Sequence, residues 1–222
     1  MTMTIAPPPP ATSAPPLTAA DLTERFGPIS LRRIRFIPEP GTATEQDVLD
    51  IHQREKRLYE LVDGVLLEKT MGLPESIVAA ALIAILHPWV SQRKLGTVAG
   101  EAGMLRIAPG LIRIPDVSFI EWDRFPNRQV QADPIPDLVP DLAIEVLSPS
   151  NTEREMEGKL DDYFRTGTRL VWFVDPRNRT VQVFSARDHS YLLTHTDTLD
   201  GAPVLPGFQL PLAQLFAELD PH

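Results

Sequence analysis

The stretch DLAIEVLSPS, residues 141–150, decides the fold class because its first part has the pattern of a strand that is apolar on both faces. Successive side chains of a strand point to opposite faces, and from Leu142 to Leu147 both sets are apolar except for Glu145. Such strands are typical of the centre of a sheet that is covered on both sides. A free carboxylate is costly there, so Glu145 requires a partner: a divalent cation or a buried basic side chain.

A helix and two strands are predicted after this stretch. Ser150 and Glu153 have the spacing of a capping box, which predicts a helix that begins there, ends near Arg165 and is stopped by Gly167. The continuous apolar run that follows predicts a second central strand, and a turn then leads to its hairpin partner. These two strands are predicted at Leu170–Val174 and Thr180–Ser185.

The preceding half of the chain has the same mixture of elements. Thr44 can cap a short helix that reaches about Arg54. Asp63 and Gly64 supply the positive φ angles of a tight hairpin turn between residues 58–62 and 65–69. Pro74 opens an apolar helix that continues past residue 86. Further strands are predicted at Thr97–Ala99, Met104–Ile107 and Asp116–Glu121, with a last helical turn near Leu212–Leu219. We therefore predict an α/β fold (α+β, mixed sheet): a central mixed β-sheet flanked by helices.

The N-terminal part is rich in proline. Residues 1–16 contain six prolines, and we predict that residues 1–43 form a largely flexible tail and residues 44–222 the folded domain. A basic cluster within this tail, Arg32, Arg33 and Arg35, belongs either to a solvated segment or to a phosphate contact.

Composition excludes several classes of site. The chain has 222 residues, 43% of them hydrophobic and 23% charged, as in a globular protein. It has no cysteine, which excludes disulfides, thiolate zinc sites and cysteine nucleophiles, and we expect a cytoplasmic protein. No apolar run reaches the roughly 18 residues that span a bilayer, so no membrane partner is expected. The net charge of −9 argues against a non-specific polyanion binder, although a metal-dependent nuclease concentrates carboxylates and can be acidic.

Three acids and one lysine are the candidate site residues. Glu60 shares a strand face with Leu58 and Val62, and Asp116 stands at the head of an apolar strand as Glu145 stands within one. Carboxylates of this kind suit magnesium or manganese. Lys159 borders the inward stripe of its helix and can reach the strand end. The alternatives are an arginine partner for Glu60, a turn role for Asp116 and a solvent-directed Lys159.

Two further acids follow prolines but fit the site less well. Asp141 shares a face with Glu145 but stands four positions earlier, roughly 13 Å along an extended strand. That distance is too long for one ion, so Asp116 is the better partner. Asp137 lies in a proline-rich loop and reads as a turn residue.

The order of these motifs resembles the Uma2 family, whose members are described as restriction endonucleases, within the PD-(D/E)xK nuclease superfamily. The resemblance covers about residues 44–185. It is carried by YELVDG (residues 59–64), PDVSF (115–119), DLAIEVLSPS (141–150), Lys159, Tyr163, Gly167 and VWFVDP (171–176).

The resemblance implies a restriction-endonuclease-like core, magnesium-dependent cleavage of DNA and a homodimer. It makes Asp116 and Glu145 metal ligands and Glu60 an additional acid. The superfamily places a lysine two residues after the glutamate, where this chain has Leu147. The family supplies that lysine from the following helix, which matches Lys159. Many relatives have a histidine near the start of the first long helix; Glu75 and Ser76 stand there, and His87 further along is read as structural or as a surface residue.

Three functions are consistent with these residues. The first is a metal-dependent endonuclease in which Lys159 stabilises developing charge. The second is a nuclease-like fold that no longer cuts and serves as a binding or regulatory module. The third is a metal-dependent phosphoesterase that acts on RNA or nucleotides.

Overall fold

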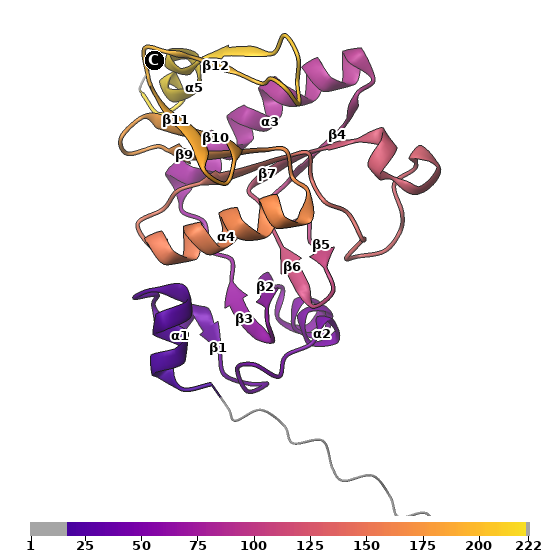
Figure 1. Ribbon diagram of the computed structural model, residues 1–222, viewed down its shortest axis with the longest axis vertical. Coiled ribbons are helices and arrows are strands. Elements are labelled where there is room, and N and C mark those ends of the chain that lie inside the picture. The colour runs from indigo at the N-terminus through magenta and orange to yellow at the C-terminus, as the bar shows by residue number, and fades with distance from the viewer. Residues whose placement is uncertain (1–16, 221–222) are drawn as a thin grey trace, which may run out of the picture.

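The computed structural model describes residues 17–220, and its elements form a mixed α/β arrangement (Figure 1). Two sheets are stacked along the long axis of the molecule, and helices cover them. The α-helices are α1 (Ala19–Phe26), α2 (Glu45–Glu55), α3 (Leu73–Arg93), α4 (Glu153–Thr166) and α5 (Leu212–Ala217). Short 3-10 helices lie at Leu31–Arg33, Trp122–Arg124 and Pro126–Arg128.

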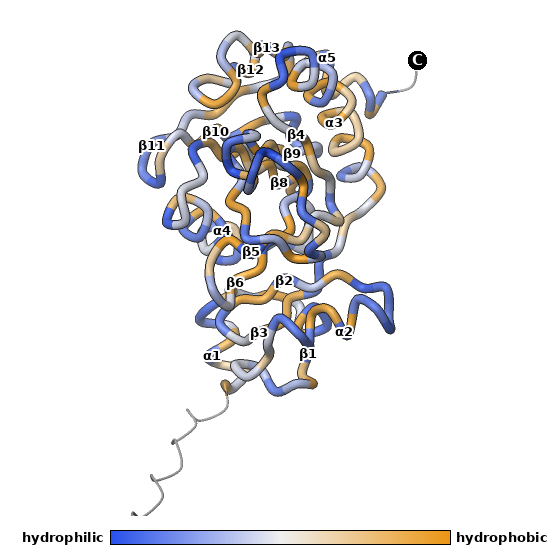
Figure 2. Tube along the Cα trace, turned by 90° about the vertical axis from the view of Figure 1, so that its right-hand side faces the viewer, coloured by the Kyte–Doolittle hydropathy of each residue, from blue (hydrophilic) through white to orange (hydrophobic). Residues whose placement is uncertain are grey.

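The larger sheet has six strands in the order β11-β10-β9-β8-β7-β4. Strands β8 and β9 are parallel, with Glu145 opposite Phe173, and every other pair in this sheet is antiparallel. Both are hydrophobic and lie inside the molecule (Figure 2), which confirms the two predicted central strands. The six strands are β4 (Gly96–Gly100), β7 (Val117–Glu121), β8 (Leu142–Val146), β9 (Leu170–Asp175), β10 (Thr180–Ala186) and β11 (His189–Thr194).

The smaller sheet has five antiparallel strands in the order β1-β3-β2-β6-β5. Its strands are β1 (Ile34–Arg35), β2 (Tyr59–Val62), β3 (Val65–Glu68), β5 (Leu105–Ala108) and β6 (Leu111–Arg113). Strand β6 was not predicted. A separate pair, β12 (Thr198–Asp200) and β13 (Gln209–Pro211), lies beside α5.

The predicted hairpin turn between β2 and β3 is confirmed. Asp63 and Gly64 have φ angles of 46° and 75°. A side chain at Gly64 would also meet the backbone of Gly41, because an ideal Cβ would lie 2.4 Å from its carbonyl carbon. The Gly64 carbonyl accepts hydrogen bonds from the amides of Gly41 and Ala43, at 2.8 and 3.0 Å. The turn therefore fixes the segment that leads into α2.

Helix α4 lies between the two sheets (Figure 1). Its inward residues Met156, Leu160 and Tyr163 join a core that includes Val62 of the smaller sheet and Val171 of the larger one. The N-cap is Thr152, which accepts a hydrogen bond from the Glu155 amide at 3.0 Å. The predicted capping box of Ser150 and Glu153 is therefore wrong by two residues.

Helix α3 covers the opposite face of the larger sheet. By length and composition it could cross a membrane, and it is the single candidate of this kind among residues 17–220. Its residues Val78, Leu82, Leu86 and Val90 are buried in the core that this face shares with α5. This packing is that of the predicted core helix, and Pro88 lies inside the helix without ending it.

The folded part begins before Thr44. Among residues 17–43, Leu22, Phe26 and Ile34 are buried in the core around α4, so this part of the predicted tail is structured; residues 1–16 lie outside the described residues. Within the basic cluster, Arg33 is buried and makes two hydrogen bonds to the Glu155 carboxylate, at 2.7 and 2.8 Å. Neither a solvated role nor a phosphate contact fits Arg33.

Asp141 has a structural role at the start of β8, at the opposite end of the strand from Glu145. Its carboxylate is buried and accepts hydrogen bonds from the Glu121 amide at 2.8 Å and from Arg124 and Arg169 at 2.9 to 3.1 Å. It links β7, β8 and the segment before β9 and takes no part in contacts with Glu145.

Replacing Asp141 by alanine should lower the free energy of unfolding by about 2 to 4 kcal/mol, because it leaves two arginines and a partly buried amide without their shared acceptor. Urea denaturation measures this. The matched control is Asp137→Ala, whose carboxylate is 83% exposed and pairs with Arg106; it should cost at most about 1 kcal/mol. Equal losses in both variants would contradict the structural role of Asp141.

Candidate active site

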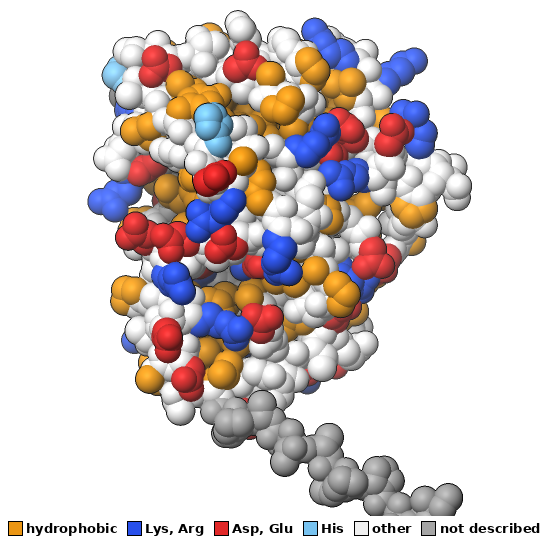
Figure 3. Space-filling model, viewed as in Figure 1, with side chains coloured by type: hydrophobic (Ala, Val, Ile, Leu, Met, Phe, Trp, Pro, Cys, Tyr) orange, Lys and Arg blue, Asp and Glu red, His pale blue; other side chains and the backbone are white. Residues whose placement is uncertain are grey.

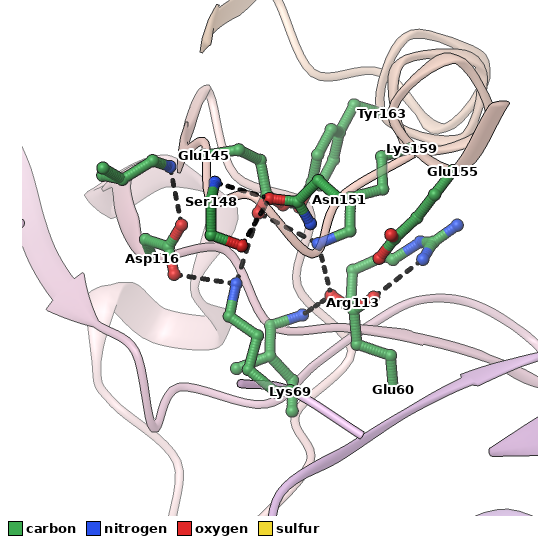
Figure 4. A network of polar contacts seen from close by, with 12 residues as sticks. Glu60, Lys69, Arg113, Asp116, Glu145, Ser148, Asn151, Glu155, Lys159 and Tyr163 are labelled. Atoms are coloured by element: carbon green, nitrogen blue, oxygen red, sulfur yellow. Dashed lines mark hydrogen bonds and ion pairs between the residues drawn. The ribbon is translucent and has the colours of Figure 1, made fainter. Parts of the chain in front are cut away.

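The four residues singled out from the sequence lie together in a buried polar cluster (Figure 4). Glu60 comes from β2, Asp116 from the residue before β7, Glu145 from the next-to-last residue of β8 and Lys159 from α4. The Lys159 amino group lies 2.9 Å from Glu145 Oε2 and 3.1 Å from Glu60 Oε1. Both sheets thus present their acids toward α4. Strand parity predicted that Glu60 and Glu145 share faces with apolar residues, and it did not by itself predict that these faces meet at the helix.

Lys69 joins Asp116 to this cluster, and it was not identified from the sequence. Its amino group lies 2.8 Å from Asp116 Oδ1 and 3.2 Å from Glu145 Oε2. The register of the β2–β3 hairpin could have predicted this residue. Leu67 is opposite Glu60, so Lys69, two residues further, is expected on the face of Glu60.

Glu60 is held by three groups of the protein. Oε2 accepts a hydrogen bond from Arg113 at 2.8 Å, and Oε1 accepts one from the Ile114 amide at 3.1 Å in addition to its contact with Lys159. Arg113 also pairs with Asp162 of α4 at 2.5 Å. The alternative that Glu60 pairs with an arginine is therefore correct, and both of its oxygens are already engaged.

Asp116 and Glu145 are each fixed through one oxygen. The Val146 amide donates to Asp116 Oδ2 at 2.6 Å, and the Tyr163 hydroxyl donates to Glu145 Oε1 at 2.6 Å. The other oxygens, Oδ1 and Oε2, both lie against the Lys69 amino group, and Oε2 also lies 2.9 Å from the Lys159 amino group. Two carboxylates from neighbouring strands therefore converge on one cation.

Burial and charge oppose each other in this cluster. Burial alone would raise the pKa of Glu145, but Lys159 and Lys69 hold that pKa below its usual value. Burial would also raise the pKa of Glu60, but Lys159 and Arg113 hold that pKa well below its usual range. For Asp116 burial prevails over Lys69, and its pKa is raised.

The cluster also shifts the pKa values of Lys69 and Tyr163. Burial would lower the pKa of Lys69, but the carboxylates of Glu145 and Asp116 raise it, so Lys69 is an ammonium at neutral pH. Burial, together with the charge of Glu145, raises the pKa of Tyr163 well above its usual value. Tyr163 therefore stays protonated and donates its hydrogen bond to Glu145.

A divalent ion needs several oxygen ligands that converge on one position. Within residues 17–220 no group of three or more Asp, Glu, His or Cys side chains is arranged to hold an ion. Asp116 and Glu145 nevertheless aim two oxygens at one position, and magnesium commonly uses one or two carboxylates and completes its shell with water. The pair fits such an ion at the position of the Lys69 amino group. Glu60 does not contribute, because Arg113, Lys159 and an amide engage its oxygens.

A cavity of about 370 Å³ reaches Asp116 from the side of α3. Ser76, Ala79 and Gly103 contribute to its lining. Ser76 thus lines the approach to Asp116 in the region where relatives are expected to carry a histidine, and Glu75 beside it is buried. His87 is exposed, in agreement with the prediction of a structural or surface role.

Comparisons with known proteins agree with this fold. The model of the Uma2 family, described as "Putative restriction endonuclease", matches residues 45–213. A crystal structure described as "a putative nuclease belonging to DUF820 from Anabaena variabilis" is similar with a TM-score of 0.66 and 20% sequence identity, over 74% of this chain and 92% of that chain. At this identity the likeness concerns the fold alone, and it agrees with the predicted mixed α/β class. The description as a restriction endonuclease comes from the family match. No curated protein matches the sequence.

Glu60→Gln should flatten the loss of stability in acid. The folded-state pKa of Glu60 is below its unfolded value, so its contribution is present above about pH 4.3 and is lost as the pH falls toward the folded pKa. Between about pH 4 and pH 2, the free energy of unfolding of the variant should fall less steeply by up to about 1.4 kcal/mol per pH unit. Urea denaturation at a series of pH values measures this. The same pH dependence of the free energy of unfolding in the variant and the wild type would contradict the lowered pKa of Glu60.

Proposed function

Because the chain belongs to the Uma2 family of nuclease-like proteins, we propose that it is a metal-dependent endonuclease that hydrolyses DNA phosphodiester bonds. The observation that carries the proposal is the convergence of Asp116 Oδ1 and Glu145 Oε2 on a single cation beside the buried Lys159. Magnesium or manganese is the proposed ion, held by these two carboxylates. When bound, such an ion supplies the positive charge that activates water and neutralises a phosphate oxygen.

The surrounding residues are proposed to hold this pair in place. Tyr163 orients Glu145 through its hydroxyl, and the Val146 amide orients Asp116. Lys159 lies between Glu145 and Glu60, where its charge stabilises the negative charge that develops on a phosphate at the site. Glu60, fixed by Arg113, acts as a positioning acid for Lys159. Glu60, expected as an additional acid of the site, is therefore proposed to position Lys159 and not to bind the ion.

The substrate is proposed to be DNA, although the surface is not strongly basic. On the face in Figure 3, basic and acidic side chains are interspersed, and the net charge is −9. Non-specific attraction to a polyanion would therefore be weak, and binding must depend on local contacts around the site. A homodimer and a cytoplasmic location stay predictions from the sequence.

A second candidate is a nuclease-like module that binds without cutting. Two observations favour it: Lys69 already neutralises Asp116 and Glu145, and Leu147 stands where the superfamily has its lysine. The third candidate, a phosphoesterase for RNA or nucleotides, uses the same site. Incubation of the protein with plasmid, single-stranded DNA, RNA and a mononucleotide, with magnesium or manganese, separates the three.

Asp116→Asn and Glu145→Gln should each lower metal-dependent cleavage of plasmid DNA by about a hundredfold or more, because each removes one of the two charged oxygens proposed to hold the ion. Gel analysis of plasmid nicking measures the rate, and circular dichroism checks the fold. Asp137→Asn, at an exposed acid, is the control with unchanged cleavage. Full activity in both site variants would contradict the proposed metal ligands.

Lys159→Met should lower the cleavage rate by about 10² to 10³-fold without weakening manganese binding, because it removes a charge stabiliser and no ion ligand. Single-turnover cleavage gives the rate and isothermal titration calorimetry gives the affinity. Lys159→Arg, which keeps the charge, should recover part of the rate. A variant that binds manganese more weakly while it cleaves at the normal rate would contradict this role.

A further inference from the structure

Lys69 occupies the position that the proposed ion requires. Its amino group lies 2.8 Å from Asp116 Oδ1 and 3.2 Å from Glu145 Oε2, the two oxygens that the proposed ion would use. An ammonium and a divalent ion cannot share this position, because both need the same lone pairs and repel each other. Either Lys69 leaves when an ion binds, or no ion binds.

The charge balance of the cluster points to displacement. In the structure the carboxylates of Glu60, Asp116 and Glu145 are matched by three cations, Lys69, Lys159 and Arg113. Asp162 at the edge pairs with Arg113 and, outside the cluster, with Arg165. A divalent ion added to this set would leave an excess of positive charge in a buried place, which is costly. Removal of one lysine offsets half of the added charge.

Lys69 is the lysine that can leave. Its side chain is 9% exposed, whereas that of Lys159 is 3% exposed. Lys69 follows the last residue of β3 and begins the irregular segment that leads to α3, and the next residue, Thr70, is exposed. Lys159 comes from within α4 and has Glu60 as a second partner. Of the two lysines, Lys69 is therefore the one that lies nearer to solvent.

We propose that Lys69 is a displaceable counter-ion, which fills the cation position between Asp116 and Glu145 in the metal-free protein and moves out when a divalent ion binds. This inference rests on the proposed metal site. It adds that Lys69 competes with the ion for the two carboxylates and so lowers the affinity of the site for the ion. It also explains how two buried carboxylates are tolerated when no ion is bound. The resting protein is stabilised by its own lysine, and the ion has to replace that interaction.

The test is manganese binding by Lys69→Met, measured by isothermal titration calorimetry and by the electron paramagnetic resonance signal of free Mn²⁺. The variant should bind manganese at least about tenfold more tightly than the wild type, since the competing charge is gone. Without metal it should melt at a lower temperature than the wild type, because two buried carboxylates lose their counter-ion, and manganese should raise its melting temperature by more.

Two further variants make the result specific. Arg57→Met removes a nearby positive charge that is 54% exposed and pairs with Glu68; its affinity for manganese should stay within about twofold of the wild type. Lys69→Met combined with Asp116→Asn should lose the tighter binding. Lys69→Gln, which keeps a hydrogen-bond donor, replaces the methionine variant if that variant does not fold.

The outcomes separate this inference from the proposed function. Binding by the wild type with equal or weaker binding by Lys69→Met would overturn the role of Lys69 and leave the metal site intact. No manganese binding by the wild type, Lys69→Met or Lys69→Gln would overturn the metal site and the inference together.

Discussion

Buried carboxylates held by buried cations are the interaction on which the arrangement of this protein depends. Glu60, Asp116 and Glu145 come from two sheets, and they are tolerated inside the molecule because Lys69, Lys159 and Arg113 lie among them. An uncompensated charge in such a place would cost several kcal/mol. The same contacts tie both sheets to α4, so the site is also the polar part of the joint between them.

Much of the fold could be predicted from the chain because it is encoded locally. The apolar pattern of residues 142–147, the Asp63-Gly64 turn and the Gly167 stop each depend on neighbours in sequence. Glu60 and Glu145 were recognisable because strand parity puts them on core-facing sides. The motif order then joined them to Asp116 and Lys159, and the structure brings all four together.

The features that were missed depend on contacts between distant segments. Arg33 and Glu155 are 122 positions apart, and their ion pair fixes an N-terminal segment that composition alone favoured as a tail. Arg113 lies on a strand of three residues, too short for a periodic signal, and meets Glu60 53 positions away. Strand parity could have placed Lys69 on the face of Glu60. Nothing in the neighbouring sequence shows that its amino group would lie between Asp116 and Glu145.

We infer that Asp116 and Glu145 form a cation site in which Lys69 lies when no metal ion is bound. A crystal structure of the protein soaked in manganese, with anomalous diffraction data, tests it most directly. We expect an anomalous peak in contact with Asp116 Oδ1 and Glu145 Oε2, with the Lys69 side chain turned away from both. A structure in which Lys69 still bridges the two carboxylates and no peak lies beside them would contradict it.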